Sequence, residues 1–331
     1  MKKFKLIVTL FLFAFVTSVY SASRGLEVQS VKKAELIGKG EYRALIIGNN
    51  SYTDETGQWK PLNTAVSDAN AVAEILKSAY GFKDVELLVD ASRSKVLKAL
   101  TALENKIEEN DSVLVYYAGH GYLDESSSRG YWIPVDANAK DHATYLRNST
   151  IRDEISIIAA KAKHTLLISD SCFSGSLLRR GASAVVPEKG ADRYYRKVAN
   201  KKSVQIMAAG GIEYVDDDYR KSGHSPFTYF LLNELKHNDK QLVTASEVSS
   251  NVIRAVANNV SQLPESGVLN GAGDELGEFI FLRVKLDVEV EGIPKDKIKV
   301  LVDVNTVEKK SSSVTEKDVG FEIHNLPVPS L

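Results

Sequence analysis

The chain has 331 residues, of which 44% are hydrophobic and 26% are charged, and this composition is that of an ordinary globular protein able to bury a core. Its formal net charge of −1 argues against a nucleic-acid partner or a membrane-surface domain, because both use a basic face. It contains one cysteine, which excludes an internal disulfide.

The N-terminus has the three-part layout of a secretory signal peptide. Three lysines lie within the first five residues, an apolar run covers 6–19, and small residues follow at 21–23. The run is shorter than the roughly 20 residues of a membrane-spanning helix. We therefore expect residues 1–23 to be a signal peptide and the protein to be secreted or periplasmic, with no stable membrane span after cleavage. An uncleaved anchor is the alternative.

From residue 41 to residue 284, short apolar runs alternate with segments whose apolar residues recur at helical spacing. This alternation predicts strands over 42–48, 85–89, 113–118, 165–169, 203–209 and 278–282. It predicts helices over 65–79, 96–107, 149–163, 226–235 and 244–260. Strands joined by helical crossovers form a mostly parallel sheet with helices on both faces. The predicted fold is therefore α/β, a three-layer αβα sandwich with a six-stranded sheet.

Three segments fall outside this alternation. Residues 24–40 show no clear periodicity and are expected to form an N-terminal arm. The segment 178–202 is basic and lacks apolar periodicity, so an exposed loop is expected there. From residue 285 to residue 331, alternating Val, Lys and Glu predict a small C-terminal β-rich extension, whose role the sequence does not indicate.

Two predicted strands lead into residues with catalytic chemistry. Cys172 follows the strand 165–169 and precedes a Ser-Gly turn, and His120 follows the strand 113–118 between two glycines that let the backbone approach a ligand closely. The carboxyl ends of parallel strands meet at one edge of the sheet, where ligand crevices form. A thiol nucleophile and an imidazole base suffice for peptide acyl transfer. The alternatives are a buried cysteine acting as a small hydrophobe and a histidine satisfied in a tight turn.

Five segments together carry a family signature: 43–49, 116–121, 169–175, 223–229 and 273–279. They resemble the caspase-like cysteine peptidases over residues 41–284. The histidine precedes the cysteine by about 50 residues, as in caspases. Asp170, two residues before the cysteine, is similar to the metacaspase and bacterial branch of that family. The resemblance implies a caspase-like fold and a His120–Cys172 dyad.

The same resemblance implies further roles. The main-chain N–H groups of Gly121 and Cys172 would stabilise the oxyanion. Asp170 would line the primary specificity pocket and select Arg or Lys before the scissile bond, although an Asp can instead cap the turn after its strand. Further acidic residues either assist that pocket or form a solvated loop: Glu213, Asp216, Asp217 and Asp218.

The predicted function is that of an exported cysteine endopeptidase acting on proteins or peptides after Arg or Lys. The alternative is a catalytically inactive caspase-like binding or scaffold module. Self-cleavage is expected in the basic segment after the nucleophile, with these candidate sites: Arg179, Arg180, Arg193, Arg196 and Lys197. Two of them, Arg179 and Arg180, stand where calcium-dependent members place an acidic ligand, which argues against calcium activation. No other cofactor and no metal site are expected.

Overall fold

The computed structural model describes residues 38, 40–171, 177–179, 192–210, 217–269 and 271–284. The chain divides into two compact units, residues 1–286 and 287–331, and all described residues belong to the first. The predicted signal peptide 1–23, nearly all of the arm 24–40 and the C-terminal extension 285–331 lie outside the described residues. In the part of the chain that the structure describes, no helix is both long and apolar enough to cross a membrane.

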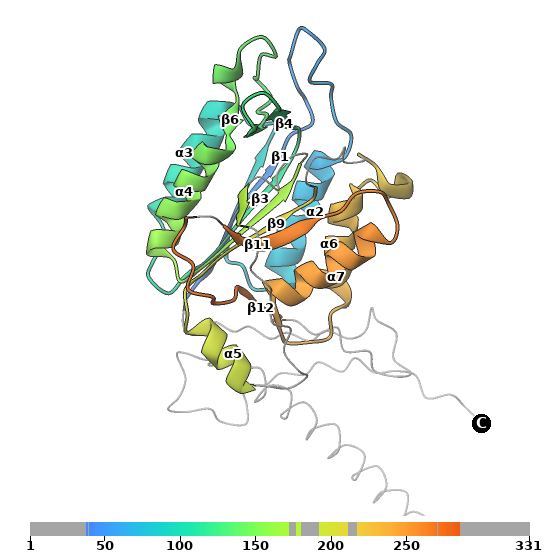
Figure 1. Cartoon of the computed structure of the whole chain (residues 1–331). Coiled ribbons are helices and arrows are strands. Elements are labelled where there is room, and N and C mark those ends of the chain that lie inside the picture. Colours follow the sequence, from blue (N-terminus) through green and yellow to red (C-terminus); the bar gives the residue numbers. More distant parts are fainter. Residues whose placement is uncertain are drawn as a thin grey trace, which may run out of the picture. The chain divides into compact units, whose positions relative to one another are not determined.

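A seven-stranded sheet with the strand order β2-β1-β3-β7-β9-β11-β8 forms the centre of the first unit (Figure 1). Five neighbouring strands run parallel: β1 (Tyr42–Gly48), β2 (Asp84–Val89), β3 (Ser112–Ala118), β7 (His164–Asp170) and β9 (Ser203–Ala208). Next to them, β11 (Glu265–Leu269) is antiparallel to β9, and the two-residue β8 (Leu178–Arg179) is antiparallel to β11. Apart from β8, this is the six-stranded, mostly parallel sheet that the sequence predicts.

The last strand of the sheet is not the one expected. The segment predicted at 278–282 forms β12 (Ile280–Leu282), which pairs with β10 (Leu242–Thr244) in a separate two-stranded sheet. The sixth position belongs to β11, whose sequence Glu-Ser-Gly-Val-Leu contains few apolar residues. Only the last residue of β11 is fully buried. The strand therefore does not need the apolar run that is typical of the inner strands, and the sequence does not show one.

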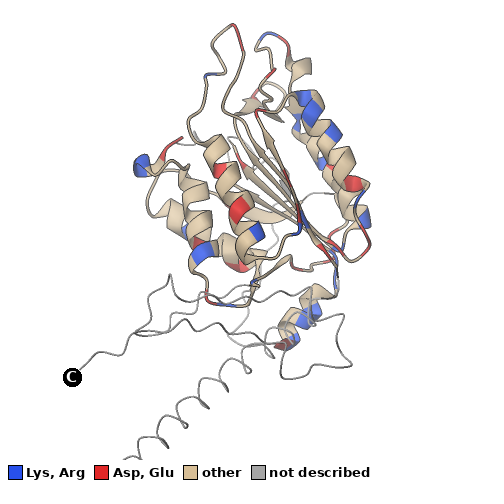
Figure 2. Cartoon of the chain, turned by 180° about the vertical axis from the view of Figure 1, so that it is seen from behind, with Lys and Arg blue, Asp and Glu red and all other residues tan. Residues whose placement is uncertain are grey.

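Helices cover both faces of the sheet, as the sequence predicts (Figure 1). The helices α3 (Arg93–Glu104) and α4 (Asn148–Lys161) lie on one face. The helices α2 (Ala65–Ala79), α6 (Pro226–His237) and α7 (Ala245–Ala257) lie on the other. Successive residues of β3 alternate between the two cores, with Tyr116 facing α2 and α6 and Tyr117 facing α3 and α4. Charged residues gather on the outer helix faces (Figure 2).

The segment 178–202 is not simply an exposed loop. Residues Asp192–Ala199 form the helix α5, and its buried Tyr195 and Ala199 pack with Leu242 and Ile280. The Tyr195 hydroxyl donates a hydrogen bond of 3.0 Å to the Leu242 carbonyl. Two inward residues one turn apart suffice to dock a short helix. Because the other residues of α5 are mostly charged, this spacing could not be recognised as a helical apolar pattern in the sequence.

This helix changes the setting of the candidate self-cleavage sites. Arg193, Arg196 and Lys197 lie in α5, and Arg179 lies in β8. Arg180 lies outside the described residues. Four of the five candidate sites therefore belong to regular secondary structure rather than to a loop.

A three-stranded antiparallel sheet follows β3 directly. It consists of β4 (Gly121–Asp124), β5 (Arg129–Trp132) and β6 (Leu146–Arg147). Figure 1 shows it above the end of the central sheet at which β3 finishes. Because β4 begins at Gly121, the turn between the two sheets consists of Gly119 and His120.

Candidate active site

The two strands predicted to carry the dyad are neighbours and end level with each other. Ala118 at the end of β3 is the register partner of Asp170 at the end of β7. The Gly119 N–H continues the pairing with a 3.3 Å hydrogen bond to the Asp170 carbonyl. His120 therefore follows one strand at the edge where Ser171 follows the other. Cys172, the next residue, lies outside the described residues.

Two tyrosine hydroxyls hold the main chain of His120. Its N–H donates to the Tyr52 hydroxyl at 2.7 Å, and its carbonyl accepts from the Tyr117 hydroxyl at 2.9 Å. A Cβ on Gly119 would lie 2.7 Å from the Tyr52 hydroxyl and 2.8 Å from that of Tyr117. The missing side chain of Gly119 makes room for the two hydroxyls. Gly119 thus serves to position His120.

A main-chain carbonyl orients the His120 ring. The Nε2 atom lies 2.7 Å from the carbonyl oxygen of Lys60, and since a carbonyl can only accept, Nε2 carries the proton. In the neutral ring, the lone pair is then on Nδ1, the atom able to accept a thiol proton. The sequence could not identify this orienting group, because a carbonyl has no side-chain signature.

Aromatic rings surround this imidazole, and burial favours its neutral form. The ring centroids of Tyr52 and Trp59 lie 4.6 and 5.7 Å from that of His120. Burial lowers the pKa of His120 because it disfavours the imidazolium, and the hydrogen bond to Lys60 opposes that shift. His120 is therefore suited to act as a base near neutral pH.

The N–H of Gly121 points away from the β4–β5 ladder. Gly121 and Trp132 are register partners, and the preceding pair is joined by the hydrogen bond from the Ile133 N–H to the His120 carbonyl, 3.0 Å long. Hydrogen-bonded and non-hydrogen-bonded pairs alternate in an antiparallel ladder, so the Gly121 pair is of the second kind. This orientation is the one an oxyanion donor at this position requires.

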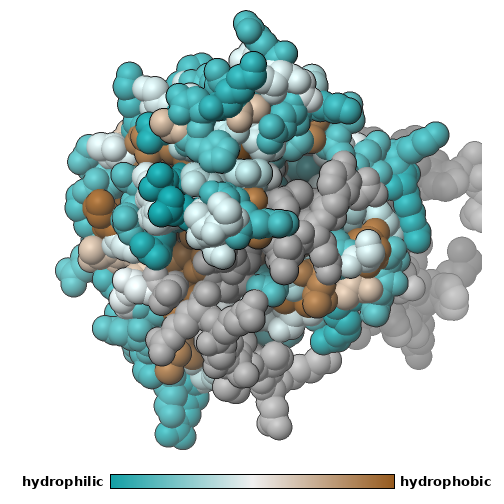
Figure 3. All heavy atoms as spheres, turned by 45° about the horizontal axis from the view of Figure 1, so that its top comes forward, coloured by the Kyte–Doolittle hydropathy of each residue, from teal (hydrophilic) through white to brown (hydrophobic). Residues whose placement is uncertain are grey.

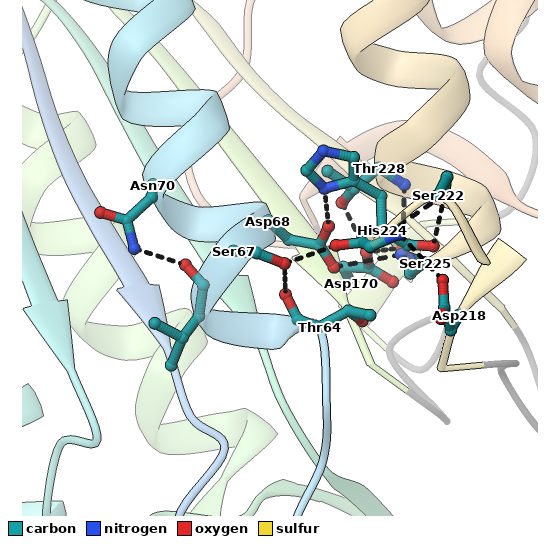
Figure 4. Close-up of polar contacts among 12 residues, drawn as sticks. Thr64, Ser67, Asp68, Asn70, Asp170, Asp218, Ser222, His224, Ser225 and Thr228 are labelled. Carbon is teal, nitrogen blue, oxygen red and sulfur yellow. Dashed lines mark hydrogen bonds and ion pairs between the residues drawn. The ribbon is translucent and has the colours of Figure 1, made fainter.

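Asp170 is buried between β7 and the start of α6 (Figure 4). Its Oδ2 atom accepts hydrogen bonds from the hydroxyls of Ser225 at 2.5 Å and Thr228 at 2.6 Å. Its Oδ1 atom is buried and has no hydrogen-bond partner among the described residues. The described contacts of this carboxylate are therefore to Ser225 and Thr228, at the start of α6.

Burial and then the nearby charge of Asp68 raise the pKa of Asp170 to about 7, against the opposing effect of the hydrogen bonds from Ser225 and Thr228. Near neutral pH, the protonated and the ionised form of this carboxyl are therefore both populated. A cation brought beside it would favour the ionised form.

Asp68 is a second buried carboxylate at this place, and the sequence reasoning missed it. It lies in the first turn of α2 with 1% of its surface exposed, and its Oδ1 is 2.6 Å from Nδ1 of His224. Burial raises its pKa, and the hydrogen bond from His224 lowers it. A sequence signal existed, because Asp68 is three residues after Ala65 and four before Val72 on the apolar face of the predicted helix.

Two acidic residues of the segment after β9 contact neighbouring loops. The Asp217 carboxylate accepts hydrogen bonds from the Asn63 N–H at 2.8 Å and from the Thr64 N–H at 3.3 Å, just before α2 begins. Asp218 accepts from the Gly223 N–H at 2.9 Å. These two residues hold loops in place, whereas Glu213 and Asp216 lie outside the described residues.

The described residues contain no group of three or more His, Cys, Asp or Glu side chains that could hold a metal ion. Figure 3 turns the top of Figure 1 toward the viewer. Its described residues are mostly hydrophilic, with hydrophobic residues in small separate groups. The chemistry that this face offers is therefore mainly that of its polar groups.

Comparison with known proteins identifies the family. The model of the caspase domain family matches residues 41–268. The chain belongs to this family. It is 29% identical over 160 residues to metacaspase-1A of Aspergillus niger, a match that covers 42% of this chain and 37% of that protein. With metacaspase-1A of Neurospora crassa it shares 28% identity over 156 residues, which cover 42% of this chain and 33% of the relative.

The chain thus matches about a third of the length of these curated relatives. A crystal structure of a Geobacter sulfurreducens protein aligns with 72% of this chain and 99% of its own, at 19% identity and a TM-score of 0.49. The family match confirms the resemblance inferred from the sequence motifs.

The tyrosine contacts with His120 lead to a first prediction. Tyr52→Phe removes the acceptor of the His120 N–H but keeps the ring, so it should lower the kcat for peptide hydrolysis about tenfold with little change in KM. Tyr122→Phe is the matched control, because its ring packs against Trp59 in the same cluster. Steady-state kinetics of the two variants test this, and equal kcat values would contradict a positioning role for Tyr52.

Proposed function

We propose that the protein is a cysteine endopeptidase that hydrolyses peptide bonds after Arg or Lys, with Cys172 as nucleophile and His120 as base. The observation that carries the proposal is the pair of buried carboxylates, Asp68 and Asp170, at the sheet edge where β7 leads into Cys172. Family membership supports the peptidase chemistry. The signal-like segment 1–23 supports export, to the periplasm or out of the cell.

In the proposed reaction, Nδ1 of His120 takes the proton of the Cys172 thiol. The thiolate then attacks the substrate carbonyl carbon, and the N–H groups of Gly121 and Cys172 stabilise the oxyanion. The imidazolium returns its proton to the leaving amine as the C–N bond breaks, which leaves a thioester. Water, deprotonated by the same imidazole, hydrolyses the thioester and restores the thiol.

Asp170 is proposed to receive the basic side chain of the substrate. Its Oδ2 is already bonded to Ser225 and Thr228, whereas Oδ1 lacks a partner among the described residues. A guanidinium or ammonium group donates only, so it matches an unpaired carboxylate oxygen. An aspartate side chain in the substrate would be repelled, which opposes the cleavage after Asp that animal caspases perform.

The direct test is a panel of fluorogenic peptides with Arg, Lys, Asn or Asp before the reporter. The wild type should cleave the Arg and Lys peptides and leave the Asp peptide intact, with or without calcium. Cys172→Ala and His120→Ala should both abolish cleavage, and circular dichroism should show that the variants are folded. Cleavage by Cys172→Ala at the wild-type rate would refute the nucleophile.

The inactive binding or scaffold module is the competing function, and alkylation kinetics separate the two. Iodoacetamide should label Cys172 rapidly, with an onset below the ordinary thiol pKa of about 8.5, if His120 activates it. A wild type that cleaves no peptide and labels slowly would support the scaffold function.

Self-processing is part of the proposal, and the secondary structure ranks its sites. A peptidase binds its substrate in an extended form, so sites in α5 require local unfolding before cleavage. We therefore expect Arg179, which lies in the extended β8, to be cut before Arg193, Arg196 or Lys197. Incubation of the wild type beside Cys172→Ala, followed by mass spectrometry of fragments over time, tests this order. Fragments in both samples would indicate a contaminating protease, and first cleavage inside α5 would contradict the ranking.

A further inference from the structure

His224 forms a hydrogen bond with Asp68, one of the two carboxylates of the proposed specificity pocket (Figure 4). Its Nδ1 is 2.6 Å from Oδ1 of Asp68, and the Ser225 N–H donates to Oδ2 of the same carboxylate at 3.3 Å. Asp68 therefore has both oxygens engaged by the segment that leads into α6. Asp170 still has Oδ1 without a partner among the described residues.

His224 is also the basic group of this cluster. Among the described residues, the ion pairs give Asp68 one basic partner, His224, and give Asp170 none. Asp218 is the other acid that acts on His224. Asp217 acts on Asp170 from the same segment. Arg220 and Lys221 belong to the His224 loop but are exposed. Among the described residues, the charge of the pocket thus depends on the carboxyls of Asp68 and Asp170 and the imidazole of His224, with Asp217 and Asp218 acting on them from the neighbouring segment.

We propose that His224 is a specificity-determining residue whose protonated ring neutralises Asp68 and opposes the binding of a basic substrate side chain, and whose deprotonation makes the pocket anionic. This inference rests on the proposed preference for Arg and Lys. It adds a pH-dependent control of that preference by a residue outside the catalytic dyad.

The sign of the effect follows from the contacts. The hydrogen bond to Asp68 raises the pKa of His224 above its ordinary value, burial opposes this, and the charges of Asp68 and Asp218 add to the rise. Below that pKa, the Asp68–His224 pair is neutral overall, and the carboxyl of Asp170 is largely protonated below about 7. As the pH rises, His224 and Asp170 both lose a proton, and the pocket gains negative charge. Preference for a cationic side chain must therefore increase with pH.

The structure of the pair can survive this change of charge. In the neutral ring with the proton on Nδ1, His224 still donates to Asp68, so the contact is kept while the positive charge is lost. The ring keeps 25% of its side-chain surface exposed, which gives solvent protons access to it. Titration thus alters the electrostatics of the pocket without needing a rearrangement.

The test replaces the ionisable ring with a neutral donor. In His224→Asn, the side-chain amide can still donate toward Asp68 but cannot become positive. His237→Asn is the matched control, because His237 is exposed at the end of α6 and bonds only within that helix, to the Asn233 carbonyl. Both variants and the wild type are assayed with paired peptides that carry either Arg or its neutral isostere citrulline before the reporter.

The quantity measured is the ratio of kcat/KM for the Arg peptide to that for the citrulline peptide. This ratio cancels the titration of Cys172 and His120, which both peptides share. It should rise with pH in the wild type and in His237→Asn. In His224→Asn it should be about tenfold higher than in the wild type at low pH, with a flatter rise, because a positive charge near the bound cation has been removed.

Two failures are distinguishable. Superimposable ratio profiles for His224→Asn and the wild type would overturn the role of His224 while the proposed function stands. A wild type that cleaves neither Arg nor Lys peptides at any pH would overturn the proposed function itself.

A measurement on the wild type covers the case of a variant that does not fold. By reciprocity of linked binding, an argininal inhibitor that prefers deprotonated His224 must lower the pKa of that ring, whereas the citrulline aldehyde must not. An NMR titration of the histidine rings with each inhibitor measures this. An unchanged His224 pKa with bound argininal would overturn the inference.

Discussion

The contact on which the candidate site depends is the one between Asp170 at the end of β7 and the hydroxyls of Ser225 and Thr228 at the start of α6. The Thr228 hydroxyl is also 2.6 Å from that of Tyr116 on β3, and Ser225 is at the same time the N-cap of α6. Two strands and a helix are thereby fixed to one carboxyl group. His224, which immediately precedes that cap, is brought to Asp68 on α2 by the same arrangement.

Burying two carboxyls together is unfavourable, and the contacts offset only part of the cost. Asp68 has both oxygens engaged, whereas Oδ1 of Asp170 has no partner among the described residues, and a buried unpaired acceptor costs about 1 to 3 kcal/mol. The raised pKa of Asp170 has burial as its largest cause. Two carboxyls whose burial is unfavourable in the free protein, and which a cation would stabilise, are typical of a binding site. Groups that serve only stability are not expected in this arrangement.

The sequence predicted the parts of the structure that follow from apolar periodicity. The helix at 65–79 and the strands that lead to His120 and Asp170 have strong patterns, and the motif around them indicated the caspase family. Elements held by a few contacts were missed. The helix α5 is docked by Tyr195 and Ala199 within a charged segment, and β11 takes its place by pairing with β9 although its own apolar content is low.

The candidate site shows the same division. His120 and Asp170 could be named because their side chains follow recognisable strands. The Lys60 carbonyl could not, since main-chain atoms carry no residue signature. Asp68 comes to Asp170 only through the packing of α2 against β1, β3 and α6. Contacts between residues far apart in the chain, such as Asp68 with His224, are products of the tertiary fold.

The central claim is that the carboxylate of Asp170, whose Oδ1 has no partner among the described residues, selects a basic substrate side chain. Asp170→Asn tests it most directly, because the amide oxygen can still accept from Ser225 and Thr228 while the negative charge is lost. Measured above pH 7, where Asp170 of the wild type is mostly ionised, the Arg-to-citrulline ratio of kcat/KM should fall about a hundredfold in a variant that remains folded. A folded Asp170→Asn protein that keeps the wild-type ratio would contradict the account.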